Sequence, residues 1–168
     1  MISSSNPHLE RGLDAMLLVY SLLESHPASA ICEQFLRTHT GWFTTTLTLL
    51  EVKAILTKVY GVDGHLATQK LVQVTMGPLA ILSVDGTTVA AAMGTADELG
   101  IDLTDAVLLQ TVQEQGVTRL ATDDHKLTQV CHQVGIIPEN PIDTTLRQQM
   151  AAWEAANLPA KGLPRLLH

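Results

Sequence analysis

Residues 102–127 read DLTDAVLLQTVQEQGVTRLATDDHKL and contain a helix, a strand and the start of a second helix. The apolar spacing of Leu103–Gln115 predicts a helix, which Gly116 ends. Val117–Ala121 is a short apolar run of strand length, and Asp124–Val134 again has the spacing of a helix. A strand between two helices is typical of an α/β fold with a mostly parallel sheet.

The rest of the chain repeats this alternation. We expect the other strands at Gly12–Asp14, Trp42–Thr46, Leu79–Val84 and Gly135–Ile137. We expect the other helices at Ala15–Leu23, Ala28–Arg37, Leu47–Tyr60, Asp63–Met76, Thr88–Leu99 and Asp143–Ala156. The sequence therefore predicts the α/β fold class, with a tail after the last helix.

Length and composition limit the class of protein. The chain has 168 residues, which is the size of a single domain. Hydrophobic residues make up 46% and charged residues 16%, which excludes a disordered acidic tail or linker protein. There is no apolar run of membrane-spanning length and no signal-peptide pattern, so we expect a cytoplasmic protein. The net charge of −7 argues against a dedicated, sequence-independent DNA-binding protein.

Carboxylates recur at two kinds of position. Some follow the end of a predicted strand, and others lie at the start of a helix that leads into a strand. Asp14 follows the first strand, Glu51 comes soon after the second, and Asp105 lies in the first turn of the helix before Val117–Ala121. Asp123 and Asp124 follow that strand directly. In a parallel sheet these positions all lie at the carboxyl edge, where ligands of open α/β sheets bind. Carboxylates that converge repel one another, and a divalent cation such as Mg²⁺ or Mn²⁺ removes this penalty.

Helix capping is the alternative explanation for each acid taken singly, because helix N-termini favour carboxylates. The residues that capping can explain are Asp14, Glu51 in a capping box with Thr48, Asp105 with Asp102 as the N-cap, and Asp123. Asp85 also follows a predicted strand and has no feature beyond capping. Spacing alone leaves the metal site and the caps as two open explanations.

Four short acidic motifs follow one another along the chain. They read LDA at 13–15 with LL at 17–18, LEVKAIL at 50–56, DLTDAVLL at 102–109 and ATDD at 121–124. Their order and spacing resemble the PIN domain family, as in the VapC-type ribonuclease toxins. The resemblance covers roughly residues 11–140, which form a PIN-like domain, and leaves 141–168 as a C-terminal helical extension and tail.

The resemblance implies three layers, α/β/α, with a five-stranded parallel sheet of order 3-2-1-4-5. It implies Mg²⁺- or Mn²⁺-dependent hydrolysis of RNA that leaves 5′-phosphate and 3′-hydroxyl ends. It implies that the catalytic residues are Asp14, Glu51, Asp105 and Asp124, and that these residues together with Asp123 bind the metal. RNA is then a partner, and so is an antitoxin protein if the chain is the toxin of a type II pair. A homodimer is also expected.

One position departs from the pattern of the family. Met16 stands two residues after the first acid, where the family usually has Asn or Ser. A polar neighbour of Asp14 is therefore missing, which predicts reduced activity. The alternative function is a catalytically weakened PIN module that binds RNA or a protein partner.

Three further residues have a structural and a functional interpretation. Thr122 can hydrogen-bond a ligating carboxylate or simply fill its strand. Trp42 is expected to pack in the core rather than to stack on bases. Trp153, in the extension, is expected to dock on its own domain or across a twofold homodimer, because burial stabilises a large apolar side chain.

Overall fold

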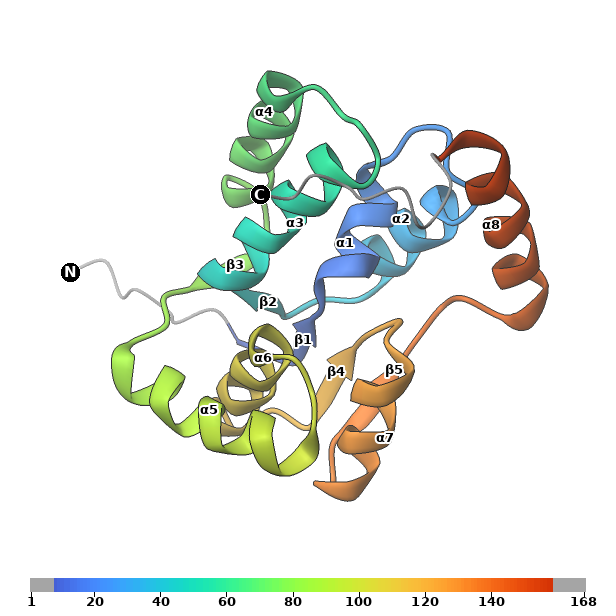
Figure 1. Cartoon of the computed structure of the whole chain (residues 1–168). Helices are drawn as coiled ribbons and strands as arrows, with labels where there is room; N and C mark the ends of the chain where they lie inside the picture. The colour runs from blue at the N-terminus through green and yellow to red at the C-terminus, as the bar shows by residue number, and fades with distance from the viewer. Residues whose placement is uncertain (1–7, 159–168) are drawn as a thin grey trace.

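The computed structural model describes residues 8–158, in which a five-stranded parallel sheet lies between two layers of helices (Figure 1). The strands are β1 (Arg11–Leu13), β2 (Trp42–Thr45), β3 (Ala80–Leu82), β4 (Arg119–Ala121) and β5 (Ile137–Glu139). The helices are α1 (Ala15–Leu22), α2 (Ser29–Thr38), α3 (Thr46–Lys58), α4 (Gly64–Thr75), α5 (Gly86–Leu99), α6 (Leu103–Glu114), α7 (His125–Gln133) and α8 (Thr144–Asn157). The order β3-β2-β1-β4-β5 confirms the predicted fold class and topology.

The central strand β1 pairs with β2 on one side and with β4 on the other. Gly12 lies opposite Phe43 of β2 and Leu120 of β4. A Cβ atom at position 12 would come within 2.6 Å of Val112 Cγ2, so glycine allows α6 to pack closely against β1. After β3 the chain crosses the sheet to β4, which makes the β1–β4 boundary the point where the strand order reverses.

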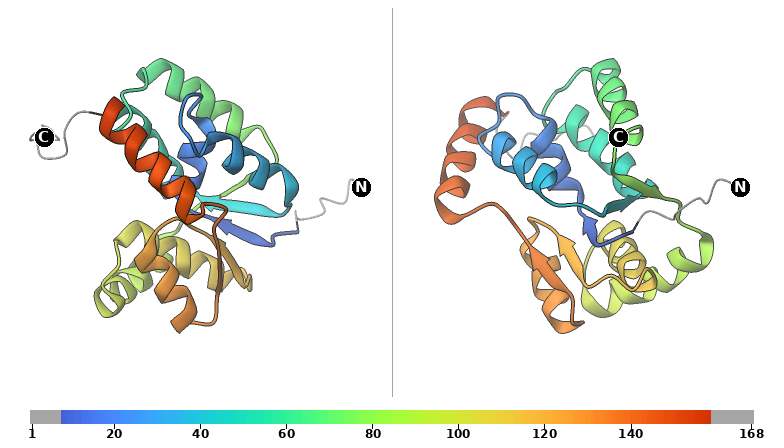
Figure 2. Two further views of the ribbon diagram at one scale, coloured as in Figure 1. Left: turned by 90° about the vertical axis from the view of Figure 1, so that its right-hand side faces the viewer. Right: turned by 180° about the vertical axis from the view of Figure 1, so that it is seen from behind.

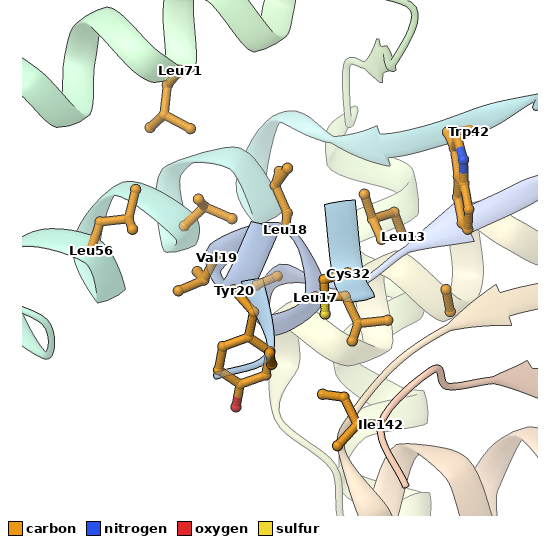
Figure 3. Close-up of a cluster of buried hydrophobic side chains, with 14 of the residues drawn as sticks. Leu13, Leu17, Leu18, Val19, Tyr20, Cys32, Trp42, Leu56, Leu71 and Ile142 are labelled. Atoms are coloured by element: carbon orange, nitrogen blue, oxygen red, sulfur yellow. The ribbon is translucent and has the colours of Figure 1, made fainter. Parts of the chain in front are cut away.

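Helices cover both faces of the sheet (Figure 2), and a hydrophobic cluster lies between the helices and the sheet on each face. Neighbouring residues of β2 point to opposite faces, so that Trp42 belongs to one cluster and Phe43 to the other. The first cluster takes its side chains mainly from α1 to α4 and includes Leu17 and Cys32 (Figure 3). The second takes them mainly from α5, α6 and α7. Trp42 is 6% exposed, which confirms its predicted place in the core.

The last strand lies later in the chain than predicted. Gly135 has a φ of 77° and belongs to the turn after α7, so the strand begins at Ile137 rather than at Gly135. It also includes Pro138, where the sequence pattern predicts an end. Because β5 is an edge strand, the missing N–H of proline can be accommodated there.

Helix α8 packs on its own chain beside α1 and the end of α3. Met150 is buried, and the ring of Trp153 lies edge-on to His26 with 5.0 Å between the ring centroids. The hydroxyl of Tyr60 donates to Glu154 Oε1 over 3.1 Å. Trp153 therefore docks on its own domain, and the predicted tail beyond Leu158 lies outside the described residues. Across residues 8–158, the helices are too short or too polar to cross a membrane.

Candidate active site

Asp14 lies where β1 gives way to α1 and is only 5% exposed. Its Oδ1 accepts a hydrogen bond from the N–H of Ala15 over 2.7 Å, and its Oδ2 accepts one from the hydroxyl of Thr122 over 2.7 Å. Burial raises the pKa of Asp14, and the charges of Asp124 and Asp123 raise it further, while the two hydrogen bonds act in the opposite direction. Asp14 is an N-cap, as expected, and is also electrostatically coupled to other acids.

The turn after β4 connects two of the predicted acids. The buried Thr122 donates to Asp14 and, through the same oxygen, accepts from the N–H of Asp124 over 3.0 Å. Asp124 is the N-cap of α7, since its Oδ1 accepts from the N–H of Leu127 over 2.6 Å. Because β1 and β4 are neighbours, Thr122 fixes the relative positions of the acids that follow these two strands. Thr122 therefore contacts a candidate ligand, as the functional interpretation expects.

Glu51 is the sixth residue of α3, in the second turn. The N-cap of this helix is Thr45, whose hydroxyl oxygen accepts from the N–H of Thr48 over 3.1 Å. The capping box that the sequence suggested between Thr48 and Glu51 is therefore wrong, because the N-cap is Thr45 and Thr48 lies inside the helix. Glu51 Oε2 is buried and finds no hydrogen-bond partner among the described residues. Burial raises the pKa of Glu51 to about 7, and the charges of Asp14 and Asp102 contribute.

Asp105 is the third residue of α6, after Asp102 at the N-cap position. The side chain of Asp102 makes no capping hydrogen bond, so this part of the capping explanation fails. Burial raises the pKa of Asp105 to about 8, and the charges of Asp14, Asp124 and Glu51 raise it in turn. The other three acids predicted to be catalytic are thus close enough to Asp105 to oppose its ionisation.

Asp85 shows what an ordinary cap looks like in this protein. It follows β3 and starts α5, where its Oδ1 accepts from the N–H of Thr88 over 2.8 Å. This hydrogen bond lowers the pKa of Asp85, whereas the pKa values of Asp14, Glu51 and Asp105 are raised. Strand β3 is at the edge of the sheet, away from the β1–β4 boundary. Asp85 is therefore a cap, as the sequence predicts.

Asp123 makes a different set of contacts. Its side chain is 7% exposed and forms an ion pair with Arg147 of α8, with 2.6 Å between Nη2 and Oδ1. Asn140 Nδ2 also donates to Oδ1, over 2.9 Å, and the hydroxyl of Tyr20 donates to Oδ2 over 3.4 Å. Asp124, not Asp123, caps α7. Sequence reasoning missed Arg147 and Asn140, because no motif connects the extension to this turn.

The four candidate catalytic acids offer only oxygen donors, which Mg²⁺ and Mn²⁺ prefer. Among residues 8–158, no three His, Cys, Asp or Glu side chains are arranged in the structure so that they could hold a metal ion together. Asp14 and Asp124 each accept a hydrogen bond from a nearby N–H group. A divalent cation would relieve two features of this edge, the unpartnered Oε2 of Glu51 and the raised pKa of Asp105. The residues present therefore fit such an ion.

A separate apolar groove of about 980 Å³ lies between α1, α2 and α4. Leu18, Leu22, Leu36, Trp42 and Val74 are among the apolar side chains that line it. Charged residues of both signs, Glu24, Glu33, Arg37 and Lys70, also line it. The groove contains none of the four candidate catalytic acids.

Comparisons with known proteins give one family match and several similar folds. Residues 13–133 match a family model described as PIN domain, while no curated protein matches the chain. The fold is similar to that of VapC20 from Mycobacterium tuberculosis, a toxin described as cleaving the sarcin–ricin loop. The TM-score is 0.63 at 12% identity, and the similarity covers 72% of this chain and 95% of that chain. It is similar to PAE2754 from Pyrobaculum aerophilum, with a TM-score of 0.58, 23% identity, and 86% and 97% covered. A toxin–antitoxin complex from Klebsiella pneumoniae gives a TM-score of 0.58 at 18% identity, with 80% and 99% covered. At these identities the likeness is one of fold.

Proposed function

Because the chain belongs to the PIN domain family, we propose that it is a metal-dependent ribonuclease that hydrolyses RNA phosphodiester bonds. PIN domains are in general nucleases that use divalent metal ions. The observation that carries the proposal is that the charges of Asp14, Glu51 and Asp124 all act on the partly buried Asp105 and raise its pKa. Capping does not explain this coupling, because Asp85 caps a helix without it.

Asp14, Asp105 and Asp124, with Glu51, would hold Mg²⁺ or Mn²⁺. When bound, the ion supplies positive charge to the scissile phosphate and lowers the pKa of water. The chain itself orients the ligands, since Thr122 fixes one oxygen of Asp14 and the helix cap fixes Asp124. Glu51 Oε2, which is free of protein partners within the described residues, can accept a hydrogen bond from the attacking water.

The alternative, a weakened module, depends on Met16. Its side chain is partly buried against the first hydrophobic cluster and brings no polar group to Asp14. Asp14 nevertheless has two hydrogen-bond donors, the N–H of Ala15 and the hydroxyl of Thr122. These donors orient the first acid without a polar residue at position 16, which favours an active nuclease over the binding module.

A nuclease assay on single-stranded RNA tests the proposal. We expect cleavage with Mn²⁺, none with EDTA, and products with 5′-phosphate ends. Asp105→Asn should lose both cleavage and the rise in thermal stability that Mn²⁺ produces. Asp97→Asn, the same change at an exposed position on α5, should keep both. A wild-type chain that binds Mn²⁺ but does not cleave would favour the binding module, and one that binds no Mn²⁺ would refute the metal site.

The groove between α1, α2 and α4 supports a protein partner as part of this proposal. A similar structure is described as a toxin–antitoxin complex, and an apolar groove edged by charges suits the apolar face of a partner helix. Co-purification with the product of the reading frame immediately upstream tests this. Val74→Glu places a charge in the groove and should abolish co-purification, while Thr75→Glu, at an exposed neighbour, should not. Equal effects of the two variants would refute this binding site.

The predicted homodimer is tested independently. Light scattering of the wild-type chain should give twice the mass of 18.1 kDa. Because Trp153 packs on its own domain, α8 is not needed to explain such a dimer.

A further inference from the structure

The carboxylate of Asp123 links the turn after β4 to Arg147 of the C-terminal extension and to Asn140, which directly precedes the extension. Arg147 and Asn140 both donate to Asp123 Oδ1, over 2.6 and 2.9 Å. Arg147 Nη1 and the hydroxyl of Tyr20 lie 3.5 and 3.4 Å from Oδ2. Both oxygens of Asp123 are therefore directed to donors on α1 and on the extension, rather than to the acids of the site.

The path from Asp123 to the site is short. Thr122 and Asp124 are its two neighbours in the chain, and the hydroxyl of Thr122 contacts Asp14 Oδ2 and the N–H of Asp124. A shift of the backbone at Asp123 therefore moves the contact that orients Asp14 and the helix cap that orients Asp124. What holds Asp123 in place also holds two candidate metal ligands in place.

The extension has its own anchors, which do not depend on Asp123. Ile142 is buried in the first hydrophobic cluster (Figure 3), and its N–H donates to Asn140 Oδ1 over 2.9 Å. Further along α8, Met150 is buried and Trp153 packs against His26. Arg147 is thus brought to Asp123 by packing on both sides of it, so that little entropy is lost when the ion pair forms.

We propose that Arg147 and Asp123 are positioning residues of the metal site. Their ion pair holds the turn at 122–124, so that Asp14 and Asp124 can bind one ion, and it keeps Asp123 from binding that ion itself. This inference rests on the proposed function. Arg147 lies on α8, outside residues 13–133 that match the family model, so the extension would contribute to the site from outside the matched region. An exposed ion pair would count for little, but the Asp123 side chain is only 7% exposed.

Calorimetric titration of the full chain with Mn²⁺ tests the proposal. Asp123→Asn and Arg147→Gln should each weaken Mn²⁺ binding about tenfold, the lower end of what losing an outer-shell partner costs. The double variant should bind no more weakly than the single ones, because both changes remove the same contact. Arg147→Lys, which keeps the charge, should recover most of the affinity. Asp124→Asn should bind no measurable Mn²⁺.

Other outcomes distinguish the alternatives. If Asp123 were a ligand, Asp123→Asn would abolish binding, and Arg147→Gln, which frees the carboxylate, would tighten it. If the pair were only structural, neither variant would change the affinity. Either result overturns the proposal, whereas a wild-type chain that binds no Mn²⁺ refutes the proposed function itself. Half of the Arg147 side chain is exposed, so the variants at this position should fold. They can show whether Mn²⁺ binding becomes weaker or tighter even if the Asp123→Asn protein does not fold. Fluorescence of Trp153 reports whether α8 stays docked.

Discussion

Replacing Asp105 by Asn should make the metal-free protein more stable, although Asp105 is a candidate catalytic residue. The pKa of Asp105 is raised from its ordinary value of 3.8 to about 8 by burial and by the charges of Asp14, Asp124 and Glu51. Because the folded-state pKa is the higher one, the contribution of Asp105 to the stability of the wild-type protein is fully present below pH 4. This contribution is lost as the pH rises towards 8. Asn carries no charge and avoids this loss.

The size of the effect follows from the pKa values. One pKa unit corresponds to about 1.4 kcal/mol. The difference between the ordinary pKa of 3.8 and pH 7 therefore limits the gain in the free energy of unfolding to about 4 kcal/mol. Solvent reaches part of the Asp105 side chain and screens the repulsion, and we therefore expect a gain of about 1–3 kcal/mol. For a domain of this size each kcal/mol shifts the melting temperature by about 2–4 °C.

Urea unfolding in EDTA at pH 5 and pH 8 measures this gain, with Asp97→Asn as the exposed control. Asp105→Asn should exceed the wild type most at pH 8 and least at pH 5. Mn²⁺ at a hundredfold excess over its dissociation constant should stabilise the wild type by about 2.7 kcal/mol and leave the variant unchanged. A variant that is no more stable than the wild type at pH 8 in EDTA would refute the electrostatic description of the site.

Three further changes test other parts of the structure. Burial lowers the pKa of His26, so the free energy of unfolding should fall as the pH drops below 6.5. His26→Gln should flatten this pH dependence, and parallel pH profiles of the wild type and the variant would contradict the burial effect. Thr122→Val keeps the shape but removes the contacts to Asp14 and the N–H of Asp124, and urea unfolding should show a loss of about 1–3 kcal/mol; a smaller loss would mean that these contacts are dispensable. Met16→Asn restores a polar neighbour to the first acid and should raise the rate of RNA cleavage, and an unchanged rate with unchanged Mn²⁺ binding would remove Met16 as a cause of weak activity.

Local sequence predicted the arrangement of the site better than the exact ends of its elements. The acids after β1 and β4 could be placed together because neighbouring parallel strands end at one edge of the sheet. Helix α3 begins at Thr46, one residue before the predicted Leu47. Local sequence did not identify its cap, because Thr44, Thr45 and Thr46 suit a strand and Thr45 and Thr48 both suit a helix cap. The capping box with Thr48 would place Glu51 one turn closer to the start of the helix than it is. The buried, unpartnered Oε2 of Glu51 argues against this box, since a capping carboxylate would have found an N–H.

The neighbouring acids Asp123 and Asp124 show what short motifs cannot decide. The resemblance selects Asp124 as the catalytic acid, but the two side chains are chemically identical and both follow β4. Local sequence therefore leaves open whether Asp123 caps α7, binds the metal or does neither. Their roles are separated by contacts from residues far along the chain, above all Arg147, which the buried residues of the extension bring to Asp123. Both oxygens of Asp123 are directed to these donors, whereas Asp124 Oδ1 accepts from the N–H of Leu127 at the start of α7. Finding this from sequence requires knowing where α8 docks, and that depends on packing against the finished core rather than on any local pattern.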